Sequence, residues 1–290
     1  MTTNQIPRAF TFLVCISAGA LLSAQNGTPN REALALRVAN AHRPDGPTPQ
    51  IDSFRCNIVL EMHDATQDKG GQAELSVDYL DYLDPKRTKP TTLLRYEVRG
   101  TERPIVRGSD MFGPWHLHRG TPTDLTGADF TNDLQTFLEH RNLAKQLVRF
   151  LSPGEVIRSL NNPSEVSNER LQLTRRKFLD VVAIEGNLEK FPMMQSAGEE
   201  APARLKIYVD PKSNHLVAVD VWPLDEGKPN LMRGERIKLG NLQKRAGLLV
   251  PHQLNYLWRD KLGKLRSHSQ VNMIKLDLQP DLSKEHFNRR

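Results

Sequence analysis

The stretch ARLKIYVDPKSNHLVAVDVW, residues 203–222, contains the clearest β-hairpin pattern in the sequence. On both sides of DPKSN, apolar and polar residues alternate, which is the pattern of a strand with one buried and one solvated face. Asp-Pro begins the turn, and Asn214 tolerates a left-handed backbone at its end. We therefore predict two antiparallel strands joined by a short turn.

The same alternation recurs on both sides of this hairpin. It is clearest over residues 54–62, 72–80 and 92–100, and again over 234–243, 248–260 and 266–278. Short segments at 103–108 and 114–120, punctuated by glycine and proline, and an apolar segment at 178–186 complete the expected strands. Residues 189–202 are expected to form a loop that is unusually apolar, because it contains Phe191, Met193 and Met194.

The centre of the chain has a helical pattern instead. Residues 132–151 place leucine, phenylalanine and valine at spacings of three and four, which is the apolar stripe of an amphipathic helix. Ser152, Pro153 and Glu155 then match a capping box, with Ser152 as the N-cap and Pro153 at the first helical position. We expect a pair of helices over about residues 131–160 that is broken sharply at Ser152–Pro153.

The order is therefore helix, strands, helix pair, strands, with no alternating βαβ rhythm. This order predicts an α+β fold with a single large antiparallel sheet. We divide the chain into a signal peptide at 1–24, an N-terminal helix and linker at 25–50, and one domain at 51–290.

The N-terminal 24 residues resemble an export signal. Arg8 is the only charge before the apolar run 9–22, and small residues follow at 23–24. This pattern predicts a periplasmic or extracellular protein; the alternative is that the segment remains uncleaved as an anchor. Cleavage removes Cys15, so Cys56 has no partner for an internal disulfide and is expected to be a buried apolar side chain.

The charge of the chain is modestly basic, with 40 Lys and Arg against 34 Asp and Glu, and it is spread along the sequence. Together with export, this argues against a nucleic-acid partner. We interpret the excess of basic residues as an ordinary solvated surface, and the more specific alternative is that this surface is attracted to anionic lipid head groups. We expect a monomer.

His116 and His118 are the strongest candidates for chemistry, because residues two apart on a strand point to the same face. A zinc site needs a third or fourth ligand, and no other histidine stands at a ligand spacing. The sequence has no HExxH, CxxC, GxSxG or phosphate-binding glycine motif. We therefore expect no metal, no cofactor and no enzymatic activity; a hydrolase with a dispersed catalytic site is kept as a further alternative.

The order of these pieces resembles the periplasmic lipoprotein carrier family, the LolA/LolB-like outer-membrane lipoprotein-sorting proteins. The resemblance is carried by 51–62 as a first strand, by Pro90 followed by the strand bearing Arg95, by Asp110 and Trp115, and by the hairpin 203–222. It implies a strongly curved, open antiparallel sheet covered by helices, with an apolar cavity for acyl chains. The segment with His116 would then be an ordinary strand of that sheet.

Two hypotheses follow. The first is a non-enzymatic carrier for an acyl chain, a lipid or a lipoprotein, held between the curved sheet and the helices. The second is a secreted structural or interaction protein whose sheet is fully packed and binds no ligand. For the first, the expected apolar lining consists of Leu60, Met62, Leu94, Tyr96, Val98, Trp115, Leu205, Ile207, Val219, Leu254 and Tyr256.

Overall fold

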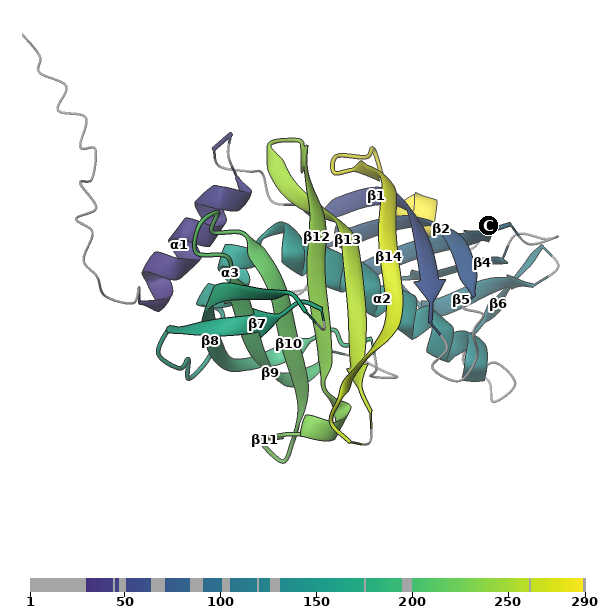
Figure 1. Ribbon diagram of the computed structural model, residues 1–290. Helices are drawn as coiled ribbons and strands as arrows, with labels where there is room; N and C mark the ends of the chain where they lie inside the picture. Colours follow the sequence, from purple (N-terminus) through teal and green to yellow (C-terminus); the bar gives the residue numbers. More distant parts are fainter. Residues whose placement is uncertain are drawn as a thin grey trace, which may run out of the picture.

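The computed structural model describes residues 30–43, 45–46, 51–63, 71–83, 91–100, 105–118, 120–125, 131–174, 176–194, 200–260 and 262–288 (Figure 1). The predicted signal peptide at 1–24 and most of the linker before residue 51 lie outside these residues. Within the described ranges, no helix is both long enough and apolar enough to cross a membrane.

Fourteen strands form one antiparallel sheet in the described part of the chain. Thirteen of them follow the order β6-β5-β4-β3-β2-β1-β14-β13-β12-β10-β9-β8-β7, and β11 pairs with β10. Among the described strands, β6 and β7 stand at the two ends of this order and are not paired with each other, so the sheet does not close. The predicted fold class is thus confirmed. The strands are β1 Ser53–Met62, β2 Gln72–Tyr82, β3 Thr91–Arg99, β4 Ile105–Asp110, β5 Gly113–His118, β6 Thr121–Asp124, β7 Ser167–Gln172, β8 Phe178–Phe191, β9 Ala201–Val209, β10 Leu216–Asp225, β11 Lys228–Pro229, β12 Glu235–Arg245, β13 Leu248–Arg259 and β14 Leu265–Asp277.

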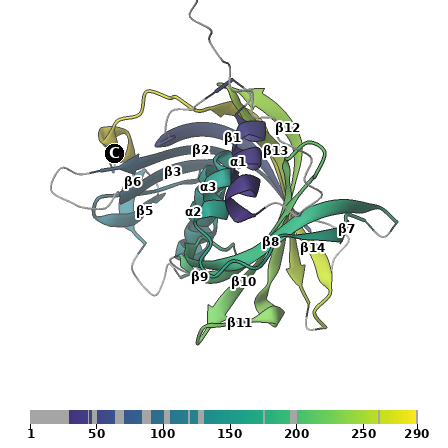
Figure 2. The same cartoon turned by 90° about the vertical axis from the view of Figure 1, so that its left-hand side faces the viewer.

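The sheet curves around its helices, which lie inside the curve (Figure 2). Register shifts interrupt several strand pairs, including β1 with β14 between Asn57 and Ile58 and β13 with β14 between Tyr256 and Leu257. Such bulges bend the strand that carries them and increase its twist. The helices inside the curve are α1 Arg31–His42, α2 Thr131–Leu151 and α3 Pro153–Arg158, and two short 3₁₀ helices follow later, η2 Leu231–Arg233 and η3 Lys284–Phe287.

The hairpin at 203–222 forms as its sequence predicts, between β9 and β10. Asn214 takes the left-handed conformation with a φ of 57°. Asp210 organises the turn, because its carboxylate accepts hydrogen bonds from the Lys212 backbone and the Ser213 hydroxyl. The hairpin places Leu205, Ile207 and Val219 on the concave face.

Two local expectations need correction. Ser152 is the N-cap of α3 and Pro153 begins the helix, as the sequence predicts, but the Ser152 side chain makes no capping hydrogen bond. Its hydroxyl instead accepts a 3.1 Å hydrogen bond from Arg43, which joins the end of α1 to the break between α2 and α3. The apolar loop expected at 189–202 is partly strand, because β8 runs to Phe191 and β9 begins at Ala201. Both differences arise from tertiary contacts that a local pattern does not contain.

The convex face of the sheet has its own covered patches. Leu171, Tyr208 and Ala218 belong to a small buried cluster over β7–β10. At the other half of the sheet, η3 packs over β3 and β4, and Phe287 is fully buried there. Both faces are therefore partly protected from solvent, which agrees with a sheet whose strands carry apolar residues on both sides.

Candidate functional site

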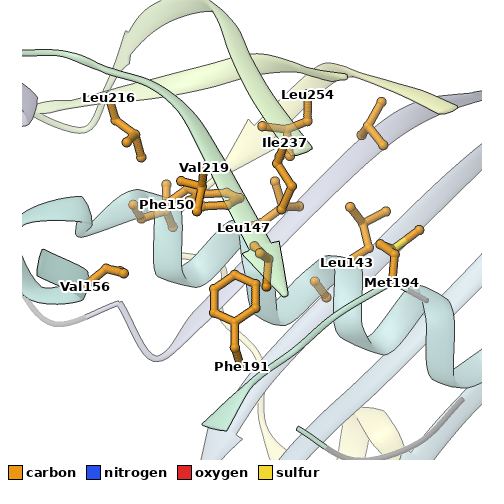
Figure 3. Close-up of a cluster of buried hydrophobic side chains, with 14 of the residues drawn as sticks. Leu143, Leu147, Phe150, Val156, Phe191, Met194, Leu216, Val219, Ile237 and Leu254 are labelled. Carbon is orange, nitrogen blue, oxygen red and sulfur yellow. The ribbon is translucent and has the colours of Figure 1, made fainter. Parts of the chain in front are cut away.

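The concave face of the sheet and the inner face of α2 share a continuous cluster of buried apolar side chains. Figure 3 shows Leu143, Leu147 and Phe150 of α2 pointing toward residues from several strands. Helix α2 crosses the curve of the sheet, so one helix contacts strands that are far apart in the sequence. This cluster is the region in which a carrier of apolar ligands would hold its cargo.

The structure brings together most of the residues that the sequence predicts as a lining. Eight are buried members of this cluster, and Val98 is half-buried against it. Met62 lies at the end of β1 and is 37% exposed. The eight buried residues are Leu60, Leu94, Tyr96, Leu205, Ile207, Val219, Leu254 and Tyr256.

Trp115 does not join them. Across β4, Trp115 pairs with Gly108, and Gly108 pairs with Arg95 of β3. The next residue, His116, pairs instead with Arg107, which pairs with the concave residue Tyr96 of β3. Because side chains alternate between the faces of a sheet, Trp115 lies on the convex side. Its ring packs so closely on Gly108 that a Cβ there would lie 2.6 Å from it. The expectation that Trp115 lines the concave cavity does not fit this register.

A few buried polar contacts tie α2 to the structure around it. Gln146 accepts a 2.7 Å hydrogen bond from the Tyr256 hydroxyl and donates to Glu235 at 3.2 Å. Gln146 also donates to the carbonyl of Pro192, and Asn142 donates to the carbonyl of Met193. The segment after β8 is thereby held against α2. Phe191, Met193 and Met194, which sequence reasoning placed in a loop, are buried in the same cluster.

His116 faces the N-terminal turn of α2. Its Nδ1 lies 3.7 Å from Asp133, which also forms an ion pair with Arg107. Arg107 donates a 3.2 Å hydrogen bond to the Tyr96 hydroxyl, and burial raises the pKa of Tyr96 to about 12. This group connects β3, β4 and β5 to α2, so the His116 side chain contributes to helix docking. Among the described residues, no three His, Cys, Asp or Glu side chains are grouped to hold a metal ion.

The apolar cluster is closely filled. Among the described residues, two voids of about 10 Å³ lie beside α2, one lined by Ile58, Leu75 and Leu143 and the other by Phe54, Leu151 and Met273. Leu147 lines both of them. A void of this size holds about one water molecule, so a ligand chain enters this space only if α2 or its side chains move.

A cleft of about 630 Å³ opens at the C-terminal end of α2, between α2–α3 and the ends of β1–β3. Its floor contains Ile51, Tyr79, Val148 and Val156, all of which belong to the apolar cluster or pack against it. Ligand sites in proteins usually measure about 300–1,000 Å³. The cleft is therefore large enough for part of a lipid, and it leads toward the filled interior.

The walls of the cleft are charged. Lys145 and Arg149, one turn apart on α2, lie 3.7 and 4.0 Å from Glu200. On the sheet side, Asp81 accepts a 2.9 Å hydrogen bond from Thr92. Burial lowers the pKa of Lys145, and the nearby Glu200 and Asp81 carboxylates oppose that shift. An apolar floor under charged walls is suited to an amphiphile.

The sequence pattern does not predict this cleft. Asp81, Lys145 and Glu200 come from a strand end, a helix and the segment before β9, and no spacing relates them. The sequence does contain one sign of buried polar contacts. Asn142 and Gln146 lie on the buried side of the helical stripe, and amide side chains at such positions need buried hydrogen-bond partners.

No protein-family model and no curated protein matches the chain. Among solved structures it is similar to a DUF1329 family protein from Desulfovibrio piger, with 9% identity, 89% of this chain and 95% of that chain covered, and a TM-score of 0.49. It is also similar to a LolA superfamily protein from Nitrosomonas europaea, with 11% identity, coverage of 90% and 98%, and a TM-score of 0.41. A third is an outer membrane lipoprotein-sorting protein domain from Vibrio parahaemolyticus, with 10% identity, coverage of 89% and 96%, and a TM-score of 0.41.

Proposed function

We propose that this chain is an exported, non-enzymatic carrier or binding protein for an acylated or otherwise apolar ligand. The observation that carries the proposal is the cleft of about 630 Å³, because its floor is continuous with the apolar cluster between α2 and the concave sheet. Export rests on the sequence pattern of residues 1–24.

The acyl chain would follow the apolar stripe of α2. Val148 lies in the cleft, and Leu147, the preceding residue, borders both residual voids. A chain that enters over Val148 therefore reaches the interior by displacing side chains along one helix. Burial of each CH₂ group contributes about 0.8 kcal/mol, so a long chain can offset the cost of moving α2.

A second candidate is favoured by the close filling of the cluster. If α2 never moves, the sheet is a packed scaffold, and the protein is a structural or interaction module without a ligand. The voids of about 10 Å³ are the observation in favour of this alternative.

Native mass spectrometry of the protein purified after export from its own envelope, followed by lipid extraction, decides between them. The carrier predicts a co-purifying acyl mass and uptake of a fluorescent fatty acid by the delipidated protein. A clean apo mass with no uptake would reject the carrier and leave the packed module.

Val148→Asp tests the entry route, because it places a carboxylate in the half-buried floor of the cleft. We expect this variant to lose uptake of the fluorescent fatty acid while it keeps a cooperative unfolding transition. Val217→Asp is the matched control, since Val217 is also half-buried but packs against the convex cluster. Equal uptake by both variants would contradict entry through the cleft.

A further inference from the structure

The charges that line the cleft are arranged by sign. The helix side carries Lys145 and Arg149 on α2 and Arg43 after α1, and the sheet side carries Asp81 of β2 and Asp52 before β1. The backbone joins the two aspartates, because the Asp81 N–H donates a 2.7 Å hydrogen bond to the Asp52 carbonyl. Apart from Glu155 of α3, the charged residues on the helix side of the cleft are basic, and those on the sheet side are acidic.

Two further carboxylates line the cleft, and both already have cationic partners. Glu155 forms a 2.5 Å ion pair with Arg158. Glu200 lies 3.7 and 4.0 Å from Lys145 and Arg149, which are long distances for ion pairs. An incoming anion with closer contacts can therefore compete with Glu200 for these two cations.

A head group with a single sign of charge fits poorly between such walls. An anionic head group would be attracted by Lys145 and Arg149 but repelled by Asp81 and Asp52. A cationic head group would have the opposite difficulty. Charge complementarity to both walls requires one cation and one anion in the same ligand.

We infer that the cleft binds the zwitterionic head group of an amphiphile, with an ammonium group against Asp81 and Asp52 and a phosphate against Lys145 and Arg149. A phosphoethanolamine lipid has this chemistry. The inference rests on the proposed function, because the acyl chain of the same ligand would occupy the apolar floor and the interior.

The test compares three single-chain lipids with the same acyl group, titrated into the delipidated protein: lysophosphatidylethanolamine, lysophosphatidylglycerol and a neutral monoacylglycerol. We expect lysophosphatidylethanolamine to bind about tenfold more tightly than lysophosphatidylglycerol, the scale of one hydrogen-bonded charge contact. Equal affinity for the two lysophospholipids would overturn the inference, and the proposed function would stand if the monoacylglycerol still binds. Failure of every lipid to bind would overturn both.

Two variants separate the walls. Asp81→Asn keeps an oxygen that accepts the hydrogen bond from Thr92, so the fold is expected to persist, and the preference for lysophosphatidylethanolamine should disappear. Lys145→Gln should weaken both lysophospholipids about tenfold and leave the monoacylglycerol unchanged. Asp180→Asn, at an exposed position on β8, is the control and should change none of the three affinities. A preference that survives Asp81→Asn would overturn the inference.

Discussion

The Tyr256 hydroxyl on β13 donates a 2.7 Å hydrogen bond to Oε1 of Gln146 on α2, and both side chains are fully buried. Tyr256→Phe would leave that amide oxygen without its donor inside the protein. We expect the free energy of unfolding to fall by about 1–3 kcal/mol, the usual cost of an unsatisfied buried polar group. Urea denaturation measures it. Tyr82→Phe, a half-buried control at the end of β2, should change stability by less than about 0.5 kcal/mol.

His42 predicts a pH dependence of stability. Its Nε2 accepts a 3.1 Å hydrogen bond from the Leu216 backbone N–H, so Nδ1 carries the proton and donates to the Leu249 carbonyl at 3.1 Å. Burial lowers the pKa of His42 to about 4, and the nearby His215 adds to the effect. A protonated ring could no longer accept from Leu216, and the end of α1 would lose its attachment to β10.

The direction follows from proton linkage. Between pH 4 and pH 6.5 the unfolded chain binds the proton at His42 and the native chain does not, so stability rises with pH. The contribution is complete above pH 6.5 and is lost as pH falls toward 4; its upper limit is on the order of 3 kcal/mol. Urea unfolding at pH 7, 5.5 and 4.5 should show a shallower decline for His42→Gln than for the unmodified chain. Identical slopes would show that His42 does not control the effect.

Gly154 tests the contact between α1 and α3. A Cβ at this position would lie 2.7 Å from the Ala35 carbonyl and 2.8 Å from the Ala39 Cβ. Alanine normally favours a helix over glycine by up to about 1 kcal/mol, but the steric conflict should reverse the sign. We expect Gly154→Ala to destabilise the protein by about 1–3 kcal/mol. Gly71→Ala, which meets no atom within 4 Å, is the control in the same thermal unfolding assay. Equal stability of the two variants would mean that the helices separate without cost.

Alternation and spacing predict much of this fold because they are local properties of the chain. The hairpin at 203–222, the helix at 132–151 and its break at Ser152–Pro153 all follow from a few neighbouring residues. The sequence of an alternating strand does not by itself determine which of its two faces points toward α2. Trp115 and His116 are both buried, on opposite sides of β5, and only pairing with Gly108 and Arg107 decides which one faces α2.

The apolar lining of the candidate site can be predicted from the sequence, but the cleft cannot. The apolar lining follows from alternation, so most of its residues meet in one cluster. The cleft depends on how α2 and α3 end above β1–β3, and its charged walls combine residues from distant segments. Whether the interior is open or filled depends on side-chain volumes across the whole curve of the sheet, which no single segment determines.

Asp220 and Arg236 form a buried ion pair on the convex face, with contacts of 2.5 and 2.6 Å. Asp220 is only 2% exposed. Asp220→Ala would leave the guanidinium buried without its main partner, so we expect a loss of about 3–5 kcal/mol. Asp180→Ala is the matched control, because its pair with Arg170 is exposed and should be worth less than about 1 kcal/mol. Chemical denaturation compares the two, and similar losses would contradict the assigned burial.

Leu147 links stability to ligand uptake. Its side chain borders both residual voids, and it is adjacent to Val148 in the cleft. Leu147→Ala would merge these spaces, and removing a buried leucine side chain costs about 2–5 kcal/mol. If an acyl chain follows α2, the enlarged space needs less displacement of the helix. The variant should then bind a fluorescent fatty acid more tightly than the unmodified chain even though it is less stable.

The control for this prediction is Leu248→Ala. Leu248 is 1% exposed in the same apolar cluster but borders neither void nor the cleft. It should lose comparable stability without any gain in affinity, which separates a specific opening beside α2 from general loosening of the core. A gain in both variants would indicate loosening, and a gain in neither would place the acyl chain away from α2.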